Sequence, residues 1–266
     1  MKVYISADIE GIATTAKWPE TWPSDREYPY HAEEMTREVL ACCRAAIDAG
    51  ATEIVVKDAH GPGTNIDIKQ LPACCRVIKG WSGHPYDMVQ DIDGSFDACL
   101  FIGYHSEAGG VGNPMSHTMT TRTQHVRING MPASEFTIYS LCAAYEGVPT
   151  VFLSGDAALC ASAEDFYPWL ITAPVKSGEG SSVCSLAPEA AWSLIYDKTR
   201  EALTEGLAEA KLPVFPEWYE VEVEYKEHTD ACNMQYFPGC RRIDSHTIGF
   251  ETEDFYKMIQ TLKFVL

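Results

Sequence analysis

Basic residues are scarce in this sequence. Its 266 residues include 20 lysines and arginines against 38 aspartates and glutamates, which gives a formal net charge of −18 at pH 7. Nucleic acids and anionic membranes are bound through basic surfaces, so we expect neither as a partner. The length allows a full hydrophobic core, in one large domain or in two unequal ones.

Long apolar stretches are also missing. No uninterrupted apolar run approaches the roughly 18–20 residues that a membrane-spanning helix needs. Asp8 and Glu10 fall where the apolar core of a secretory signal would lie. These two absences predict a cytoplasmic protein.

The ten cysteines do not form any Cys-x-x-Cys pair; four of them stand as the adjacent pairs 42–43 and 74–75. We expect reduced thiols that pack as small apolar side chains, and no thiolate metal site. Neither a Gly-x-Gly-x-x-Gly nor a Gly-x-x-x-x-Gly-Lys-Ser/Thr sequence occurs, so the usual phosphate-binding loops are absent too.

An acidic motif follows the first apolar segment. Residues 3–5 are typical of a buried strand, and residues 6–11 read Ser-Ala-Asp-Ile-Glu-Gly. If the strand continues, Asp8 and Glu10 project to one face, where two buried carboxylates repel each other unless a cation joins them. The alternative is that Asp8 caps a following helix and Glu10 is solvated.

Two later segments end in a similar way. A helix is predicted over residues 31–49, and a buried strand over residues 53–60 ends at His60. A strand, a helix and a strand in this order indicate a right-handed parallel crossover. Residues 97–105 repeat the pattern and end at His105. Because ligands bind at the carboxyl ends of parallel strands, we expect a metal centre there.

Further elements complete the prediction of a doubly wound α/β fold, with a mainly parallel sheet flanked by helices. Ser134 is a plausible N-cap that places Glu135 in the first turn of a helix, where acids are common without any functional role. The other predicted segments are strands at 76–80, 117–128, 148–156 and 171–175, helices at 160–169 and 188–205, and a flexible loop at 178–182.

We expect two domains: residues 1–210 as the α/β metal-binding domain and residues 211–266 as a smaller α+β unit. The second unit follows a linker at 211–216 and contains an antiparallel strand at 218–225, a strand near 242–250 and a final helix from about residue 254. It could pair with the strand at 117–128. A Trp- and Pro-rich segment at 13–30 is expected to be a long loop, either a lid over the acids or a subunit contact.

The placed motifs resemble those of the zinc-dependent D-aminopeptidase family, the DppA-like peptidases. The resemblance covers most of the chain, with weaker similarity after about residue 176. It rests on residues 6–11, on Lys-Asp-Ala-His at 57–60, on Gly-Tyr-His at 103–105, and on Met-Ser-His-Thr at 115–118.

Members of that family are dinuclear zinc enzymes, so the resemblance implies two Zn²⁺ ions per chain. It implies that Asp8 bridges both ions and that the remaining ligands are Glu10, His60, His105 and Glu135. It implies a catalytic role for His117, as acid/base or as nucleophile. It also implies a preference for short D-residue peptides such as D-Ala-D-Ala, and a homo-oligomeric decamer that encloses the sites.

This donor set, with carboxylates and imidazoles but no thiolate, suits two-metal hydrolysis, in which metal-activated water attacks a peptide bond. Two alternatives remain open at this stage. One is a two-metal hydrolase of another amide, an ester or a phosphoester. The other is a non-catalytic protein that binds a metal or small molecule, with His117 merely structural.

Overall fold

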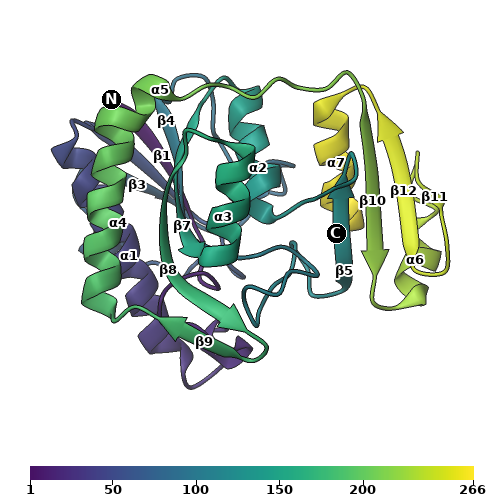
Figure 1. Ribbon diagram of the computed structural model, residues 1–266, viewed down its shortest axis with the longest axis horizontal. Coiled ribbons are helices and arrows are strands. Elements are labelled where there is room, and N and C mark those ends of the chain that lie inside the picture. Colours follow the sequence, from purple (N-terminus) through teal and green to yellow (C-terminus); the bar gives the residue numbers. More distant parts are fainter.

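The computed structural model describes all residues 1–266 and contains two β-sheets (Figure 1). The larger has seven strands in the order β3-β2-β1-β4-β7-β8-β9, and every neighbouring pair is parallel except β8 and β9. Its strands are β1 (Lys2–Ala7), β2 (Glu53–Asp58), β3 (Cys75–Ile78), β4 (Ala98–Tyr104), β7 (Thr150–Asp156), β8 (Ile171–Glu179) and β9 (Ser182–Ser185). The expected doubly wound, mainly parallel sheet is confirmed.

Helices cover both faces of this sheet. One face carries α1 (Tyr28–Asp48) and α4 (Pro188–Glu201), and the other carries α2 (Glu135–Tyr145) and α3 (Ala157–Phe166) (Figure 1). Alternate residues of β1 point to opposite faces, so Val3 and Ile5 join the core under α1 and α4, whereas Tyr4 joins the core under α2 and α3. The sheet is buried on both sides, as its continuous apolar strands require.

The smaller sheet is antiparallel, with the order β11-β12-β10-β5-β6. Its strands are β5 (Thr123–Ile128), β6 (Met131–Pro132), β10 (Tyr219–Tyr225), β11 (Arg241–Arg242) and β12 (Thr247–Thr252). The C-terminal helix α7 (Phe255–Val265) packs against this sheet, and its Met258 shares one core with Phe136 of α2. Residues of the second sheet therefore bury their apolar face against the α2 side of the first.

Three segments differ from the sequence prediction. The segment 117–128 is a strand only over β5, because Met119 has a backbone φ of 61° and interrupts the extended conformation. His117 and His125 therefore do not share a strand face. The loop expected at 178–182 is the turn of the β8–β9 hairpin, with Gly180 at φ 59°. The short helix α6 (His228–Met234) was not predicted.

Other boundaries shift by a few residues. Helix α3 begins at Ala157 because the Asp156 side chain accepts a hydrogen bond from the Leu159 amide and caps it. Helix α4 continues as a π-helical turn over Ala202–Gly206 and as α5 (Leu207–Glu209). Short 3₁₀ helices occur at Trp18–Glu20, Ile68–Gln70 and Asp87–Val89. All ten cysteines are free, and none of the helices combines the length and apolar character needed to cross a membrane.

Candidate metal centre

The carboxyl ends of three adjacent strands position the candidate ligands. Asp8 directly follows β1, His60 follows β2 after one residue, and His105 directly follows β4. Because β1 lies between β2 and β4 in the sheet, Asp8 lies between the two histidines. Glu135 reaches the same place as the first residue of α2, where Ser134 caps the helix by accepting a hydrogen bond from the Thr137 amide. The expected convergence at this sheet edge is present in the structure.

The Asp8 carboxylate divides its two oxygens between two groups of side chains. Its Oδ1 lies 3.3 Å from His60 Nδ1, and its Oδ2 lies 3.4 Å from His105 Nε2. On the first side, His60 Nδ1 is also 2.9 Å from Glu10 Oε2. On the second side, His105 Nε2 is 3.4 Å from Glu135 Oε2. Asp8 is thus the side chain common to two donor clusters.

A backbone carbonyl fixes the tautomer of each histidine. His60 Nε2 lies 2.9 Å from the Thr21 carbonyl, His105 Nδ1 lies 2.9 Å from the Ser106 carbonyl, and His117 Nδ1 lies 2.9 Å from the Met115 carbonyl. A carbonyl only accepts, so each of these nitrogens donates a hydrogen. In the neutral ring, the other nitrogen then carries a lone pair that faces the carboxylates, which is the arrangement found in histidine metal ligands.

Buried polar atoms in the centre lack partners. Asp8, Glu10, His105 and Glu135 are each at most 3% exposed. Asp8 Oδ2, Glu10 Oε2 and His105 Nε2 have no hydrogen bond, although Asp8 Oδ2 lies 3.4 Å from His105 Nε2 and Glu10 Oε2 lies 2.9 Å from His60 Nδ1. Leaving such atoms unsatisfied is costly, and divalent cations held by these carboxylates and imidazoles would satisfy them. The donor set also fits zinc, which accepts nitrogen and oxygen ligands.

The pKa shifts of these side chains also favour a bound cation. Burial disfavours the charged form of both histidines, yet the adjacent carboxylates raise the pKa of His60 and of His105 well above the usual value. Burial also disfavours ionised Asp8 and Glu135, but the neighbouring histidines lower the pKa of both carboxyl groups. Asp8 and Glu135 are therefore ionised, and nearby positive charge stabilises them. Protonated histidines or a metal ion would supply that charge.

Glu135 also connects the centre to His117. Its Oε1 lies 3.5 Å from His117 Nε2 and accepts a hydrogen bond of 2.6 Å from the Met119 amide. The imidazole of His117 stacks on that of His105, with the ring centroids 4.3 Å apart. One donor atom each from His105, His117 and Glu135 lie within 4.8 Å of one another, and the same holds for Asp8, Glu10 and His105. His117 is therefore within reach of a metal ion as well as of a substrate.

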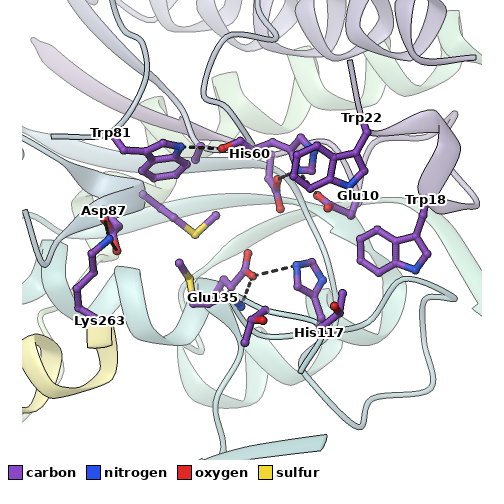
Figure 2. Close-up of a pocket in the computed structure, with 16 residues that line it drawn as sticks. Glu10, Trp18, Trp22, His60, Trp81, Asp87, His117, Glu135 and Lys263 are labelled. Atoms are coloured by element: carbon purple, nitrogen blue, oxygen red, sulfur yellow. Dashed lines mark hydrogen bonds and ion pairs between the residues drawn. The ribbon is translucent and has the colours of Figure 1, made fainter. Parts of the chain in front are cut away.

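A cavity of about 730 Å³ opens onto this centre, and Figure 2 shows the side chains that line it. Asp8, Glu10, His60, His117 and Glu135 are all part of its wall. His105 is not, because it is fully enclosed beneath them. The cavity gives a ligand direct access to both donor clusters.

Two tryptophans of the 13–30 segment line the same cavity. Trp18 packs edge-on against His117 and Trp22 against His60, at centroid distances of 5.3 and 6.0 Å. The sequence predicts this segment as a long loop, either a lid over the acids or a subunit contact, and the structure places two of its tryptophans beside the acids. The mixture of Trp and Pro after the acidic motif was the one available signal, and it does not say which side chains face the cavity.

Comparison with known proteins gives a consistent result over the whole length. The family profile described as D-aminopeptidase matches residues 1–264. A D-aminopeptidase of Bacillus subtilis (strain 168) is 30% identical over 264 residues, which cover 98% of this chain and 95% of the relative. The solved structure described as the Zn-dependent D-aminopeptidase DppA from Bacillus subtilis, a self-compartmentalizing protease, matches with a TM-score of 0.93 and 29% identity, over 100% of this chain and 96% of that one. The resemblance inferred from the motifs is confirmed: this chain belongs to the D-aminopeptidase family of peptidases.

Proposed function

We propose that this chain is a dinuclear zinc aminopeptidase that removes the N-terminal residue from short peptides, with a preference for D-residues as in D-Ala-D-Ala. The observation that carries the proposal is the position of Asp8, whose two carboxylate oxygens face two different histidines. A carboxylate placed in this way is suited to bridge two metal ions about 3.5–4 Å apart, as in two-metal hydrolases.

The remaining ligands would divide between the two sides of Asp8. Glu10 and His60 would complete one set, and His105 and Glu135 the other, in agreement with the contacts that these side chains make. Bound zinc would supply Lewis acidity to the scissile carbonyl and lower the pKa of water toward neutrality.

The protein itself would provide binding and proton transfer. The cavity beside the centre would receive the N-terminal residue of a peptide, whose neutral amine is a nitrogen donor of the kind that zinc accepts. His117 lines the cavity and keeps its Nε2 free toward Glu135, because Nδ1 donates to the Met115 carbonyl. A neutral Nε2 can take a proton from attacking water and deliver it to the departing amine, which typically contributes about 10²–10⁴-fold to the rate. The alternative role of His117 is nucleophilic attack on the scissile carbonyl.

Turnover of matched substrates tests this proposal. We expect the zinc-loaded protein to hydrolyse D-Ala-D-Ala faster than L-Ala-L-Ala, and to lose activity on chelation and regain it with zinc. His117→Ala should keep the zinc content of the wild type while turnover falls by at least about 10²-fold. Zinc loss in this variant would instead make His117 a ligand.

Two outcomes would refute the peptidase assignment. Activity on p-nitrophenyl phosphate alone would favour a phosphoesterase. The absence of turnover of any substrate, together with equal ligand binding by wild type and His117→Ala, would favour a non-catalytic binding protein.

We further propose three features of the whole protein. It assembles into a homo-oligomer, a decamer in the resembling family, in agreement with the self-compartmentalizing relative. It works in the cytoplasm, where its ten free cysteines stay reduced. Residues 1–210 and 211–266 act as two units, with β5 of the first paired to β10 of the second.

A further inference from the structure

Lys263 is the one lysine or arginine among the residues that line the large cavity. It belongs to the C-terminal helix α7, whereas the metal-ligand candidates come from the first sheet and α2. In Figure 2, Lys263 and its partner Asp87 lie on the side of the cavity opposite Trp18, and Glu135 lies between them. The cavity therefore has an acidic centre and a single cationic group away from it.

We propose that the Lys263 ammonium binds the C-terminal carboxylate of the peptide substrate. This inference rests on the proposed aminopeptidase function and adds the substrate class: short peptides with a free carboxylate, in preference to capped or long ones. A short peptide carries an ammonium at one end and a carboxylate at the other. Two bound zinc ions would offset the charge of the three buried carboxylates, so this charge does not select an end of the peptide. The bond that an aminopeptidase cleaves adjoins the N-terminal residue, so the C-terminal carboxylate extends away from the metal centre. Lys263 is the cationic side chain of the cavity that lies away from that centre.

The lysine is held in place for such a role. Its Nζ lies 2.6 and 2.8 Å from the two oxygens of Asp87, a side chain that is only 3% exposed. An ammonium has three hydrogens, and these contacts engage two of them, so one remains for a ligand. The Lys263 side chain is 28% exposed and lines the cavity, so a ligand in the cavity can reach it.

The backbone at Asp87 supports the same interpretation. Asp87 has a φ of 26°, in a region that a non-glycine residue rarely occupies. Strained backbone of this kind is maintained by the surrounding structure and is common at ligand-binding positions. The wall of the same cavity also contains Met88, Met119, Thr120 and Thr121, which provide apolar surface and hydroxyl groups.

A purely structural role is the competing explanation, because the Lys263–Asp87 pair also ties α7 to the 3₁₀ helix Asp87–Val89 between β3 and β4. The two explanations differ in their effect on substrate choice. A structural tie affects all substrates alike, whereas a carboxylate site affects only those with a free carboxylate.

The experiment compares D-alanyl di- and tripeptides with their C-terminal amides, using the zinc-loaded protein. We expect wild type to favour the acid over the amide by at least 10-fold in kcat/KM for one of the two lengths, mainly through KM, with a preference that falls as salt rises. Lys263→Met should lower this acid-to-amide ratio at least 10-fold, and Lys263→Arg should restore part of it. Lys257→Met, on an exposed lysine of the same helix, should leave the ratio unchanged.

Each contrary result overturns the proposal. If wild type hydrolyses acid and amide equally at both lengths, Lys263 does not select a carboxylate, whether or not the variants fold. If Lys263→Met slows acid and amide alike, the pair is only a structural tie. If wild type with zinc cleaves neither substrate, the aminopeptidase function itself fails and this inference fails with it.

Discussion

At the scale of single residues, Glu10 is held in place through its backbone. Its carbonyl oxygen accepts hydrogen bonds from Lys176 Nζ and, at 3.0 Å, from Asn113 Nδ2. Lys176 comes from β8 and also donates to the carbonyl of Thr15, at 2.7 Å. The loop that presents Glu10 is thus fixed from two other parts of the chain.

Removal of the buried lysine should loosen this loop. Lys176 is 3% exposed, so Lys176→Met would leave two buried carbonyls short of a donor. We expect a loss of about 1–3 kcal/mol in the free energy of unfolding, measured by urea denaturation, together with weaker zinc binding. Lys198→Met, on a half-exposed residue of α4, is the control. Equal stability and equal zinc affinity in Lys176→Met would show that the lysine does not hold the loop.

Glu38 makes stability depend on pH. Burial raises the pKa of this carboxyl group to about 8, although the Ala13 amide and Lys176 oppose the rise and Glu34 adds to it. The folded state therefore binds more protons at Glu38 than the unfolded state between about pH 4.5 and 8. This contribution to stability is present at low pH and is lost as the pH rises through that interval, by up to about 1.4 kcal/mol per pH unit.

Glu38→Gln should abolish this loss. We expect the free energy of unfolding of the variant to exceed that of wild type by more at pH 8 than at pH 5, as measured by chemical denaturation at both values. Burial also lowers the pKa of Lys176 to about 8, and Glu38 opposes that fall. The variant loses this opposition, so its Lys176 pKa falls further and its stability gains more as the pH rises toward 8, in the same direction as the effect of Glu38. Glu189→Gln changes the same charge on an exposed site of α4. A pH difference no larger than that of Glu189→Gln would contradict the expected effect.

At the scale of elements, β1 and β4 approach each other closely at their carboxyl ends. Gly103 of β4 has a φ of 70°, and a Cβ added there would lie 2.3 Å from the Asp8 carbonyl. The Gly11 amide donates to the Gly103 carbonyl at 2.7 Å. This glycine therefore allows Asp8 and His105 to come together.

Gly103→Ala should separate these strand ends. We expect a loss of more than about 2 kcal/mol in the free energy of unfolding, with zinc content reduced in any protein that folds. Gly147→Ala is the matched control, since Gly147 has a φ of 81° but open space around it, and should cost about 1 kcal/mol. Thermal denaturation of both variants measures the difference. Equal melting temperatures would mean that close packing at Gly103 is unimportant.

Sequence patterns predict some of these elements and side-chain positions but not others. Buried strands followed directly by Asp8, His60 and His105 were recognisable because parallel strands deliver their ends to one edge. Glu135 was recognisable only as a helix-end acid, since its approach to His105 depends on how α2 packs. The interruption at Met119 depends on a backbone amide that bonds to Glu135, a contact that no local pattern encodes.

At the scale of the whole molecule, large apolar side chains remain on the surface. Val214, Val111 and Tyr236 are 95%, 85% and 81% exposed. Such residues, exposed singly, are also found on monomeric proteins. The support for the proposed self-assembly is therefore the description of the structural relative as self-compartmentalizing.

Light scattering coupled to size exclusion tests the assembly. We expect a single species with a mass several times that of the 29.5 kDa chain, independent of moderate dilution. A mass equal to one chain at all concentrations would exclude a self-compartmentalizing arrangement for this protein.

The most direct test of the proposed centre is the zinc content per chain, measured by elemental analysis after dialysis against zinc-free buffer. We expect about two zinc ions in the wild type, as in two-metal hydrolases, and a sharp fall in Asp8→Ala, because Asp8 faces both histidine sides of the centre. Only trace zinc in wild type after zinc has been supplied, or an unchanged content in Asp8→Ala, would contradict a shared dinuclear centre.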